Sequence, residues 1–438
     1  MIAAHDTARG GSLGGRLSAR QALRRWGLPW LALLALVSLG AAEAASGAAV
    51  RAEHVGEQAG IYEQTRTYGA TAGDLDGDDR PDLLIVRHYQ DFPRVYLNDR
   101  PSIGIFEDIH DWAFAEPLKP NRDRHDCPFG DVNGDGRIDI FCTAGGRRGG
   151  NGPNPSELWL GTGPPAGPPE FTRSSEAGDF DLGPADDKYG RGRDAAFIDA
   201  NGDEFPDLYI LNAFPRKDGR SGASRLFINE GGVGFRRAPE FGANKVIGSD
   251  NLQVLDYNGD GREDILVCGK KGVRLLRNKG HRRFADVTRR AKLGMRCTHA
   301  LLAQADSDAG GRPDLFRFGR GAFTVHRQRP NRTFGRAIHR RKVRFGDQMV
   351  VGNMTRDDKA DAYLLRRGPA GADKPDVMLL NRRSGKRFHK LGIPQLRQGS
   401  GDAVTAIDHD LNGLTDVVVM NGHRTVEGPI ELLAFYDD

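Results

Sequence analysis

A nine-residue acidic segment recurs seven times along the chain, and this repeat constrains the fold more than any other feature. The copies, numbered here as loop one to loop seven, begin between 47 and 68 residues apart. They read DLDGDDRPD from Asp74, DVNGDGRID from Asp131, DANGDEFPD from Asp199, DYNGDGRED from Asp256, DSDAGGRPD from Asp306, NMTRDDKAD from Asn353 and DHDLNGLTD from Asp408. Such a period is the signature of an architecture that stacks one supersecondary unit many times.

Each acidic segment is followed by a short apolar run, which predicts a β-strand because it is too short for a helix and rich in β-branched and aromatic residues. A second run ends at Asn, as at 95–98 and 226–229, and an aromatic residue then opens a further strand. These aromatic residues are Phe106, Phe171, Phe235, Phe284, Phe334 and Phe388. The residues before each acidic segment supply the remaining strand. The pattern predicts an all-β fold, a seven-bladed β-propeller of four-stranded blades.

The two ends of the chain favour a closed ring. The seventh unit stops after its third strand, at 431–436, and lacks a fourth. The stretch 60–65 resembles an orphan fourth strand, with Tyr62 in the aromatic position. We therefore expect the last blade to be completed by the N-terminal strand. An open solenoid is the alternative, and it would leave one end unpaired.

The acidic segments have the donor chemistry of calcium sites. Oxygen side chains stand at relative positions 1, 3, 5 and 9, and six to eight oxygens without His or Cys select Ca²⁺ over Zn²⁺ or Cu²⁺. An EF-hand does not fit, because the closing acid comes at position 9 rather than 12 and strands flank the loop. We predict about five Ca²⁺ sites, in loops one, two, three, four and seven. Their ligands are Asp74, Asp76, Asp78, Asp82, Asp131, Asn133, Asp135, Asp139, Asp199, Asn201, Asp203, Asp207, Asp256, Asn258, Asp260, Asp264, Asp408, Asp410, Asn412 and Asp416.

The alternative is that Asp, Asn and Gly only make the turn, since all three are ordinary turn residues. That alternative does not account for the acid at position 9, which opens a strand where Asp is disfavoured. Loop five has Gly310 in place of its third ligand, and loop six offers the weaker set Asn353, Thr355, Asp357 and Asp361. Many of the acidic residues lie in these loops, so the surface outside them is expected to be basic.

The first 44 residues read as a secretory signal peptide. Five arginines between Arg9 and Arg25 precede an apolar run from Trp26 to Leu39, and a small-residue stretch then offers an Ala-x-Ala cleavage site after Ala44. The run is shorter than the roughly 20 residues that span a bilayer, although a retained N-terminal anchor is the alternative. We expect a linker at 45–59, the propeller at 60–438 and a secreted, periplasmic or cell-surface location, with no membrane span in the mature chain.

The acidic loops D-x-[DN]-G-D-x-x-x-D, the Asn-ended third strand and the aromatic that follows resemble FG-GAP/VCBS repeats. Such repeats build the propeller of integrin α-chains and of cartilage acidic protein-like secreted proteins. The resemblance covers about 60–438. It implies a seven-bladed propeller with Ca²⁺ between the first and second strands and a role in adhesion or ligand binding. No integrin stalk or membrane region follows, so an integrin's signalling role does not carry over.

We predict a protein or glycan ligand on the face opposite the calcium loops, where the connections of the first three units are long: 108–125, 145–156, 172–193 and 212–224. Their aromatic and charged residues are Trp112, Phe114, Arg122, Arg147, Arg148, Asp186, Asp187, Tyr189, Arg191, Arg193, Arg216 and Lys217. Solvated connections are the alternative. We expect a monomer that binds no nucleic acid, since no nucleic-acid motif accompanies the positive charge.

No nucleophile elbow, zinc motif or phosphate-binding loop is present, so we predict a binding module rather than an enzyme. The alternative is a polysaccharide lyase or hydrolase that uses carboxylates near the channel mouth. Acids stand at or just before the first strands, at Asp126, Asp194, Asp250, Asp347 and Asp402, with His299 and Tyr68 at comparable places. Hydrogen bonding to loop backbone is the more ordinary role for such residues.

Four cysteines allow three disulfide pairings. Cys127 and Cys142 flank loop two, and Cys268 and Cys297 lie on consecutive units. An exported protein can oxidise these two local pairs, but buried free thiols fit the sequence equally well. Their disulfide state stays open at this point.

Overall fold

The structure is a computed structural model of the chain. It describes residues 50–87, 93–98, 102–115, 123–145, 156–164, 167–174, 192–212, 223–244, 246, 249–269, 272–303, 311–319, 321–344, 346–357, 359–366, 375–382, 384–393, 403–422 and 427–437. The predicted signal peptide, 1–44, therefore lies outside the described residues, as do parts of the predicted ligand-binding connections.

Strands of the described residues form seven antiparallel blades, one for each acidic segment. Blade one is β3 (Thr67–Gly73), β4 (Asp82–Arg87), β5 (Arg94–Asn98) and β6 (Phe106–Asp108); blade two is β7 (Phe129–Gly130), β8 (Asp139–Cys142), β9 (Glu157–Gly161) and β10 (Phe171–Arg173). Blade three is β11 (Gly192–Ile198), β12 (Asp207–Asn212), β13 (Arg225–Asn229) and β14 (Phe235–Arg237); blade four is β15 (Ser249–Leu255), β16 (Asp264–Gly269), β17 (Gly272–Asn278) and β18 (Phe284–Asp286).

Blade five is β19 (His299–Ala303), β20 (Asp314–Gly319), β21 (Ala322–Gln328) and β22 (Phe334–Lys342); blade six is β23 (Gly346–Gly352), β24 (Asp361–Arg366), β25 (Val377–Asn381) and β26 (Phe388–Leu391). Blade seven is β27 (Ala403–Ile407), β28 (Asp416–Met420) and β29 (Gly428–Asp437), joined by the N-terminal β1 (Val50–His54) and β2 (Gln64–Thr65). A short helix α2 (His110–Ala113) follows β6, and a 3-10 turn η2 (Pro239–Phe241) follows β14. No helix in the described ranges is long and apolar enough to cross a membrane.

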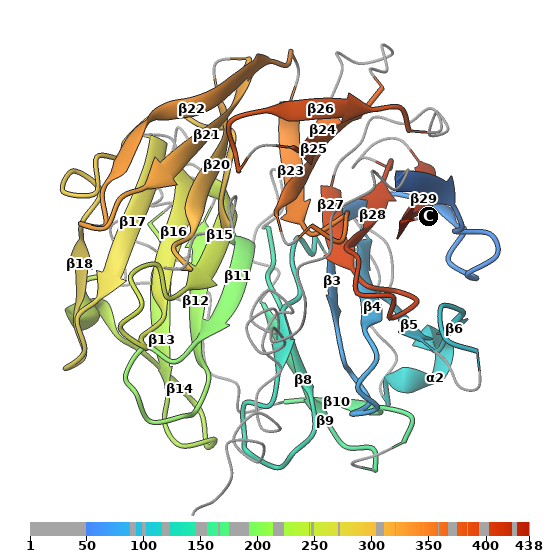
Figure 1. Cartoon of the computed structure of the whole chain (residues 1–438). Coiled ribbons are helices and arrows are strands. Elements are labelled where there is room, and N and C mark those ends of the chain that lie inside the picture. Colours follow the sequence, from blue (N-terminus) through green and yellow to red (C-terminus); the bar gives the residue numbers. More distant parts are fainter. Residues whose placement is uncertain are drawn as a thin grey trace, which may run out of the picture.

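Each blade is a meander whose strand order follows the chain. The first strands of neighbouring blades contact one another, for example β3 with β27, β15 with β19 and β19 with β23. In Figure 1 the blades are coloured in sequence order, from blue through green and yellow to red. This arrangement confirms the predicted seven-bladed propeller. The six predicted aromatic residues open the fourth strands, and Asn98, Asn229 and Asn278 lie directly opposite Phe106, Phe235 and Phe284 in the register.

The apolar core lies between blades rather than in one central mass. The second strands β12, β16 and β20 are buried at all six positions. One cluster packs Tyr209 and Ile228 of blade three against Ile265 and Val267 of blade four. Because a second strand is covered on both faces by neighbouring blades, its sequence is a continuous apolar run instead of an alternating one.

The N-terminal segment closes the ring, as predicted, but its main strand is not the predicted one. Val50–His54 pairs antiparallel with β29 from Asp437 to Leu433, and Figure 1 shows this blue strand beside the red β29. Within 60–65 only Gln64 and Thr65 pair with β29, and Tyr62 is 39% exposed. The stretch predicted as a linker thus contains the longer closing strand. The chain leaves the β29 edge at Gly56 and returns to it at Glu63, whose carbonyl accepts a hydrogen bond from Ile430.

Candidate functional site

The acidic loops all join the first strand of a blade to its second strand. Loops one to four and seven are described in full, loop six lacks residue 358, and 306–310 of loop five lie outside the described residues. Because every blade has the same strand order, these loops emerge on one face, which we name the loop face. The connections between second and third strands, and those from one blade to the next, emerge on the opposite face.

The first aspartate of a loop organises the turn. In loop two, Oδ1 of Asp131 accepts a hydrogen bond from the amide of Gly134 (2.7 Å), and Oδ2 accepts one from Gly136 (2.9 Å). These glycines at positions 4 and 6 have φ of 75° and 83°, in the left-handed region that favours glycine. In loops one and four, Asp74 and Asp256 accept the corresponding two hydrogen bonds from the backbone amides at positions 4 and 6.

The aspartate at position 9 has a second structural role that the turn alone does not explain. In loop three, Oδ2 of Asp207 accepts the amide of Ala200 (3.0 Å) and Oδ1 accepts the amide of Asn229 (2.8 Å) at the end of the third strand. The same pair of bonds recurs at Asp82, Asp139, Asp264, Asp361 and Asp416. Each of these carboxylates therefore ties its loop to two strands. An acceptor-only side chain explains why Asp opens a strand here.

Burial makes these position-9 carboxylates hard to ionise. Desolvation raises the pKa of Asp139, Asp207, Asp264 and Asp361 to about 7, against the lowering effect of the backbone hydrogen bonds. Nearby loop acids add to the rise, as Asp203 and Asp199 do at Asp207. A bound cation would favour the charged forms and relieve this repulsion.

The donor set of loop one fits a hard cation. Carboxylate oxygens of Asp74, Asp76 and Asp78 lie within 4.8 Å of one another. All three side chains are half-buried, and oxygen ligands of this kind suit Ca²⁺. Loop seven gives a second indication, because Oδ1 of Asp408 is buried and has no hydrogen-bond partner. A buried carboxylate oxygen without a partner is costly, and a cation would satisfy it.

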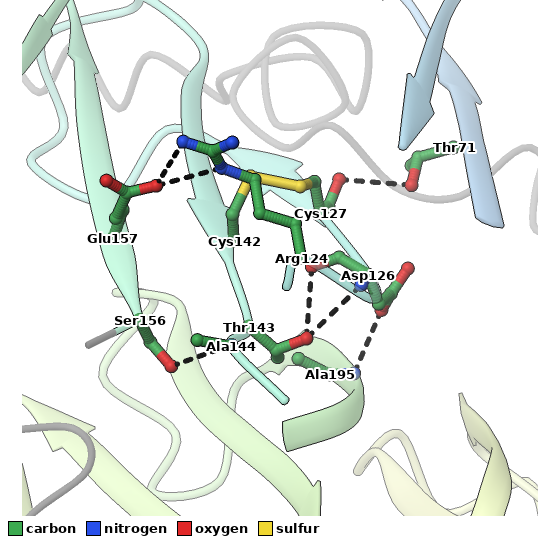
Figure 2. The surroundings of a disulfide bond; sticks show 10 residues. All are labelled: Thr71, Arg124, Asp126, Cys127, Cys142, Thr143, Ala144, Ser156, Glu157 and Ala195. Carbon is green, nitrogen blue, oxygen red and sulfur yellow. Dashed lines mark hydrogen bonds and ion pairs between the residues drawn. A yellow bond between two sulfur atoms is a disulfide. The ribbon is translucent and has the colours of Figure 1, made fainter. Parts of the chain in front are cut away.

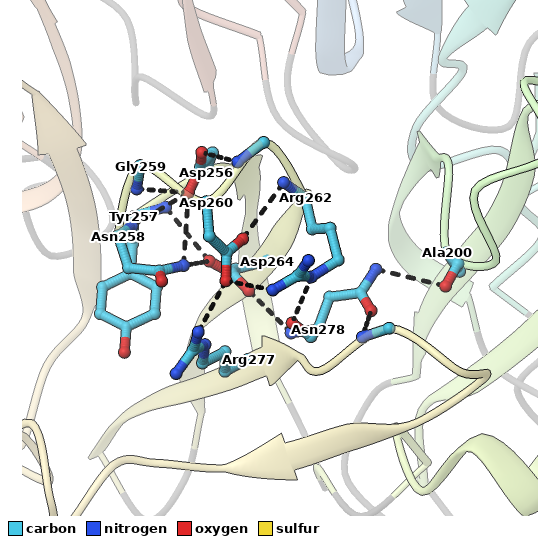
Figure 3. A network of polar contacts seen from close by, with 12 residues as sticks. Ala200, Asp256, Tyr257, Asn258, Gly259, Asp260, Arg262, Asp264, Arg277 and Asn278 are labelled. Carbon is cyan, nitrogen blue, oxygen red and sulfur yellow. Dashed lines mark hydrogen bonds and ion pairs between the residues drawn. The ribbon is translucent and has the colours of Figure 1, made fainter.

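In loop four, two arginines stand beside the acid at position 5 (Figure 3). The carboxylate of Asp260, at position 5, accepts hydrogen bonds from Arg262 (2.6 Å) and Arg277 (2.7 Å). Burial raises the pKa of Asp260, but the hydrogen bond from Arg277 and the other contacts together lower it. In loops one and two the basic residue at position 7 likewise pairs with the position-5 acid, as Arg137 does with Asp135 (3.1 Å). Loops three and seven carry Phe205 and Leu414 at position 7, so no such cation competes there.

Loop six has features of both kinds. Oδ1 of Asn353 is buried without a hydrogen-bond partner, as in loop seven. The ammonium of Lys359, however, donates to Oδ2 of Asp357 at 2.9 Å, and the Thr355 hydroxyl lies 3.0 Å from Oδ1 of Asp357 and 3.2 Å from Oδ2 of Asp361, within hydrogen-bond distance of either acceptor. A protein cation thus stands beside the acid of this loop, as in loops one, two and four.

Two groups in the loops were not anticipated from the sequence. His409, at position 2 of loop seven, is buried, and its Nδ1 lies 2.5 Å from Oδ2 of Asp416. The surrounding acids raise the pKa of His409 although burial lowers it. The strand-end asparagines are the other group. Nδ2 of Asn229 donates to the carbonyl of Val132 in loop two (2.6 Å), and Asn278 donates to Ala200 in loop three (3.2 Å). The recurrence of Asn was visible in the sequence, but its partner in the preceding blade was not.

On the opposite face, most of the predicted ligand residues lie outside the described residues: Arg122, Arg147, Arg148, Asp186, Asp187, Tyr189, Arg191, Arg216 and Lys217. Trp112 is 46% exposed in α2. Phe114 packs against Trp159 and Phe171, so it belongs to the core. The guanidinium of Arg193 lies 5.2 Å from the ring centroid of Tyr68, and the Tyr68 ring stacks on His125.

The acids of the first strands are described in part. Asp126 is half-buried and accepts a hydrogen bond from the amide of Ala195 (2.9 Å), so it joins blade two to blade three through backbone (Figure 2). His299 lies 3.1 Å from Asn251 and is buried. The side chain of Asp250 and all of Asp402 lie outside the described residues.

Both local cysteine pairs are disulfides. Cys127 is bonded to Cys142, which joins the first and second strands of blade two, where β7 has only two residues. Cys268 is bonded to Cys297 and joins blade four to blade five. Figure 2 shows the first bridge beside the buried ion pair of Arg124 and Glu157, 2.8 Å apart.

Comparison with solved structures finds other chains of low identity. A lectin of Agrocybe aegerita, described as recognising non-reducing terminal N-acetylglucosamine, is 18% identical over 74% of this chain and 79% of its own, with a TM-score of 0.49. BBS1N in complex with ARL6DN is 11% identical over 84% and 92%, with a TM-score of 0.46. The V. cholerae biofilm matrix protein Bap1 is 13% identical over 86% and 62%, with a TM-score of 0.36.

No curated protein matches the sequence. Three segments match the FG-GAP-like repeat family: 74–142, 199–267 and 256–316. Each matched segment begins at the first aspartate of an acidic loop and runs through the next strands. The narrower likeness to cartilage acidic protein-like proteins stays a prediction. The matched segments and the seven blades together show a β-propeller that carries FG-GAP-like repeats.

Proposed function

We propose that this propeller is a calcium-stabilised, exported ligand-binding or adhesion module that performs no catalysis. The observation that carries the proposal is the repeated acidic loop on one face of the ring. Its oxygens converge within 4.8 Å in loop one, and a buried carboxylate oxygen has no partner in loop seven. Calcium bound at the loop face would make the ring rigid, and the connections on the opposite face would then be available to bind a ligand.

Calcium would be held by the side chains at positions 1, 3 and 5, for example Asp74, Asp76 and Asp78, and would neutralise their mutual repulsion. The chain's own residues hold each loop in place. The position-9 aspartates attach each loop to its strands, and the strand-end asparagines attach it to the neighbouring blade. Calcium would thus act on the rigidity of the scaffold, and the ligand would bind elsewhere.

The binding role is tested with the mature protein, residues 45–438, on panels of polysaccharides and of extracellular proteins. We expect saturable binding in about 2 mM Ca²⁺, a concentration well suited to extracellular calcium modules, and weaker binding in EDTA. No reducing sugar or unsaturated product should appear from any bound polysaccharide. Product release would contradict the absence of catalysis, and no binding on either panel would contradict the module.

Export is tested separately, by expressing the full chain and sequencing the N-terminus of the released protein. We expect processing after Ala44, at the Ala-x-Ala site. A chain that keeps Met1 and stays with the membrane fraction would instead support the N-terminal anchor.

A further inference from the structure

A basic pocket lies at the junction of blades five and six, on the face opposite the acidic loops. Its volume is about 320 Å³, within the range of small-ligand sites. Five of the lining residues are cationic: Arg341, Lys342, Arg344, Arg366 and Lys390. The other two, Val343 and Val377, are buried and form an apolar part of the wall. Among the residues that the structure describes, no carboxylate lines this pocket.

The topology explains how these residues meet. β22 has nine residues, whereas the outer strands β6, β10, β14 and β18 have three each. The extra length carries Arg341 and Lys342 to the face opposite the loops. β24 starts at Asp361 on the loop face, so Arg366 at its far end reaches the same place. His339 of β22 packs on Phe388 of β26, 4.9 Å between ring centroids, which holds the two blades together.

Charges on an exposed outer strand commonly protect its edge from pairing with another chain, and β22 is the edge of its blade. That role covers Lys342 but does not explain the convergence of Arg366 and Lys390 from another blade. Arg366 is also held in place, because its Nε donates to the carbonyl of Arg344 (3.0 Å) and its Nη1 to that of Pro375 (3.0 Å). Within the described residues, Arg341, Lys342, Arg344 and Lys390 have no acidic side chain at ion-pair distance.

We infer that this pocket binds an acidic polysaccharide through its carboxylate or sulfate groups. The inference deepens the proposed ligand-binding function and rests on it. Arginine and lysine supply the charged donors that such anions require, and the valines offer apolar contact to the C–H faces of a sugar. A single-stranded nucleic acid would need aromatic side chains for base stacking, and none lines the pocket. A standard protein–protein interface would need a much larger surface.

The test compares the mature protein with two charge-matched triple variants. The pocket variant is Lys342→Glu, Arg344→Glu and Lys390→Glu, all at exposed positions. The control is Arg283→Glu, Arg289→Glu and Arg290→Glu, exposed positions of blade four outside the pocket. The probes are polygalacturonate for carboxylates, heparin for sulfates, neutral dextran, single-stranded DNA and an acidic peptide. Titrations are run in calcium at low and at physiological salt, after circular dichroism has established that each variant is folded.

We expect the mature protein to bind polygalacturonate or heparin in a salt-dependent manner and dextran not at all. The pocket variant should lose about 30-fold or more in affinity, and the control less than about 5-fold, because both carry the same net charge but only one changes the site. Tighter binding of polygalacturonate would show that the pocket prefers carboxylate groups, and tighter binding of heparin would show that it prefers sulfate groups.

Equal losses in the two variants would overturn the inference, because binding would then follow net charge alone. Tighter binding of DNA or of the acidic peptide than of either polysaccharide would overturn the ligand class. Binding of a neutral glycan or a protein that the pocket variant retains would overturn the inference and leave the proposed function in place. Absence of binding to every probe and panel would overturn both.

Discussion

At the scale of single residues, the loop-closing aspartates of loops one to four, six and seven use their two oxygens to accept backbone amides, one from the loop and one from the third strand. Asp207 does so with Ala200 and Asn229, and it is fully buried. Asp203, at position 5 of the same loop, is exposed and bonds only within the turn. We therefore assign Asp207 a role in folding and Asp203 a role in metal binding.

We expect Asp207→Asn to lower the free energy of unfolding by about 2 kcal/mol in EDTA and in Ca²⁺ alike, because an amide nitrogen would face a backbone N–H. Asp203→Asn should leave the EDTA value within about 0.5 kcal/mol of the parent and reduce only the gain on adding calcium. Chemical denaturation of both variants in the two buffers measures this. A calcium-dependent loss at Asp207 with none in EDTA would contradict its structural role.

His299 gives the fold a defined dependence on acid. Burial lowers its pKa to about 4, whereas an unfolded histidine titrates near 6.5. A group with a depressed folded pKa contributes stability above its unfolded pKa, and this is lost as the pH falls toward the folded value. Between pH 7 and pH 4.5 the parent should lose roughly 2.5 kcal/mol more than a His299→Gln variant. Urea denaturation at the two pH values checks this; parallel pH profiles of the two proteins would refute it.

At the scale of elements, several neighbouring blades are joined by a polar contact at the end of a third strand as well as by the apolar core. Nδ2 of Asn229 donates to Val132 of the preceding blade and to Pro206 of its own, and its Oδ1 accepts the amide of Gly232. Asn98 makes the corresponding bond to His409, from blade one to blade seven. These contacts link the loops to each other around the loop face.

We expect Asn229→Ala to lower the free energy of unfolding by about 2 kcal/mol, because the buried carbonyl of Val132 loses its donor. The neighbouring Glu230→Ala removes only an exposed ion pair to Arg236 and should cost less than about 0.5 kcal/mol. Equilibrium unfolding of both variants measures the difference. Equal effects would mean that the asparagine contact between blades contributes nothing measurable.

The bridge between blades four and five acts on the same scale. Cys268 and Cys297 are 29 residues apart, and closing a loop of this length stabilises by about 3 to 4 kcal/mol in the chain-entropy treatment. The double variant Cys268→Ser, Cys297→Ser should therefore unfold at lower denaturant than the parent, and reduction should not destabilise it further through this bridge. A variant as stable as the oxidised parent would contradict the assignment of a stabilising role.

At the scale of the whole molecule, the sequence was sufficient to predict the ring, because seven acidic segments and their strands recur at regular spacing. The closing strand was misplaced because Val50–His54 has no apolar run of its own, and its pairing is set by the free edge of β29. The structural role of the position-9 aspartates was not predictable either, since a metal ligand and a buried acceptor of backbone amides require the same residue type. The basic pocket joins residues of β22 and the connection after it with residues of β24, β25 and β26, a proximity that only the fold creates.

The central claim, that the loop face holds calcium, is tested most directly by thermal unfolding of the mature protein in about 2 mM Ca²⁺ and in excess EDTA. At the affinities of extracellular modules, roughly 0.1 to 1 mM, each site adds about 0.7 to 1.8 kcal/mol by linkage. Five sites in a chain of this size should raise Tm by about 4 to 11 °C. An unchanged Tm, with no metal retained through EDTA, would contradict the claim and leave the acidic loops as turns held by their own hydrogen bonds.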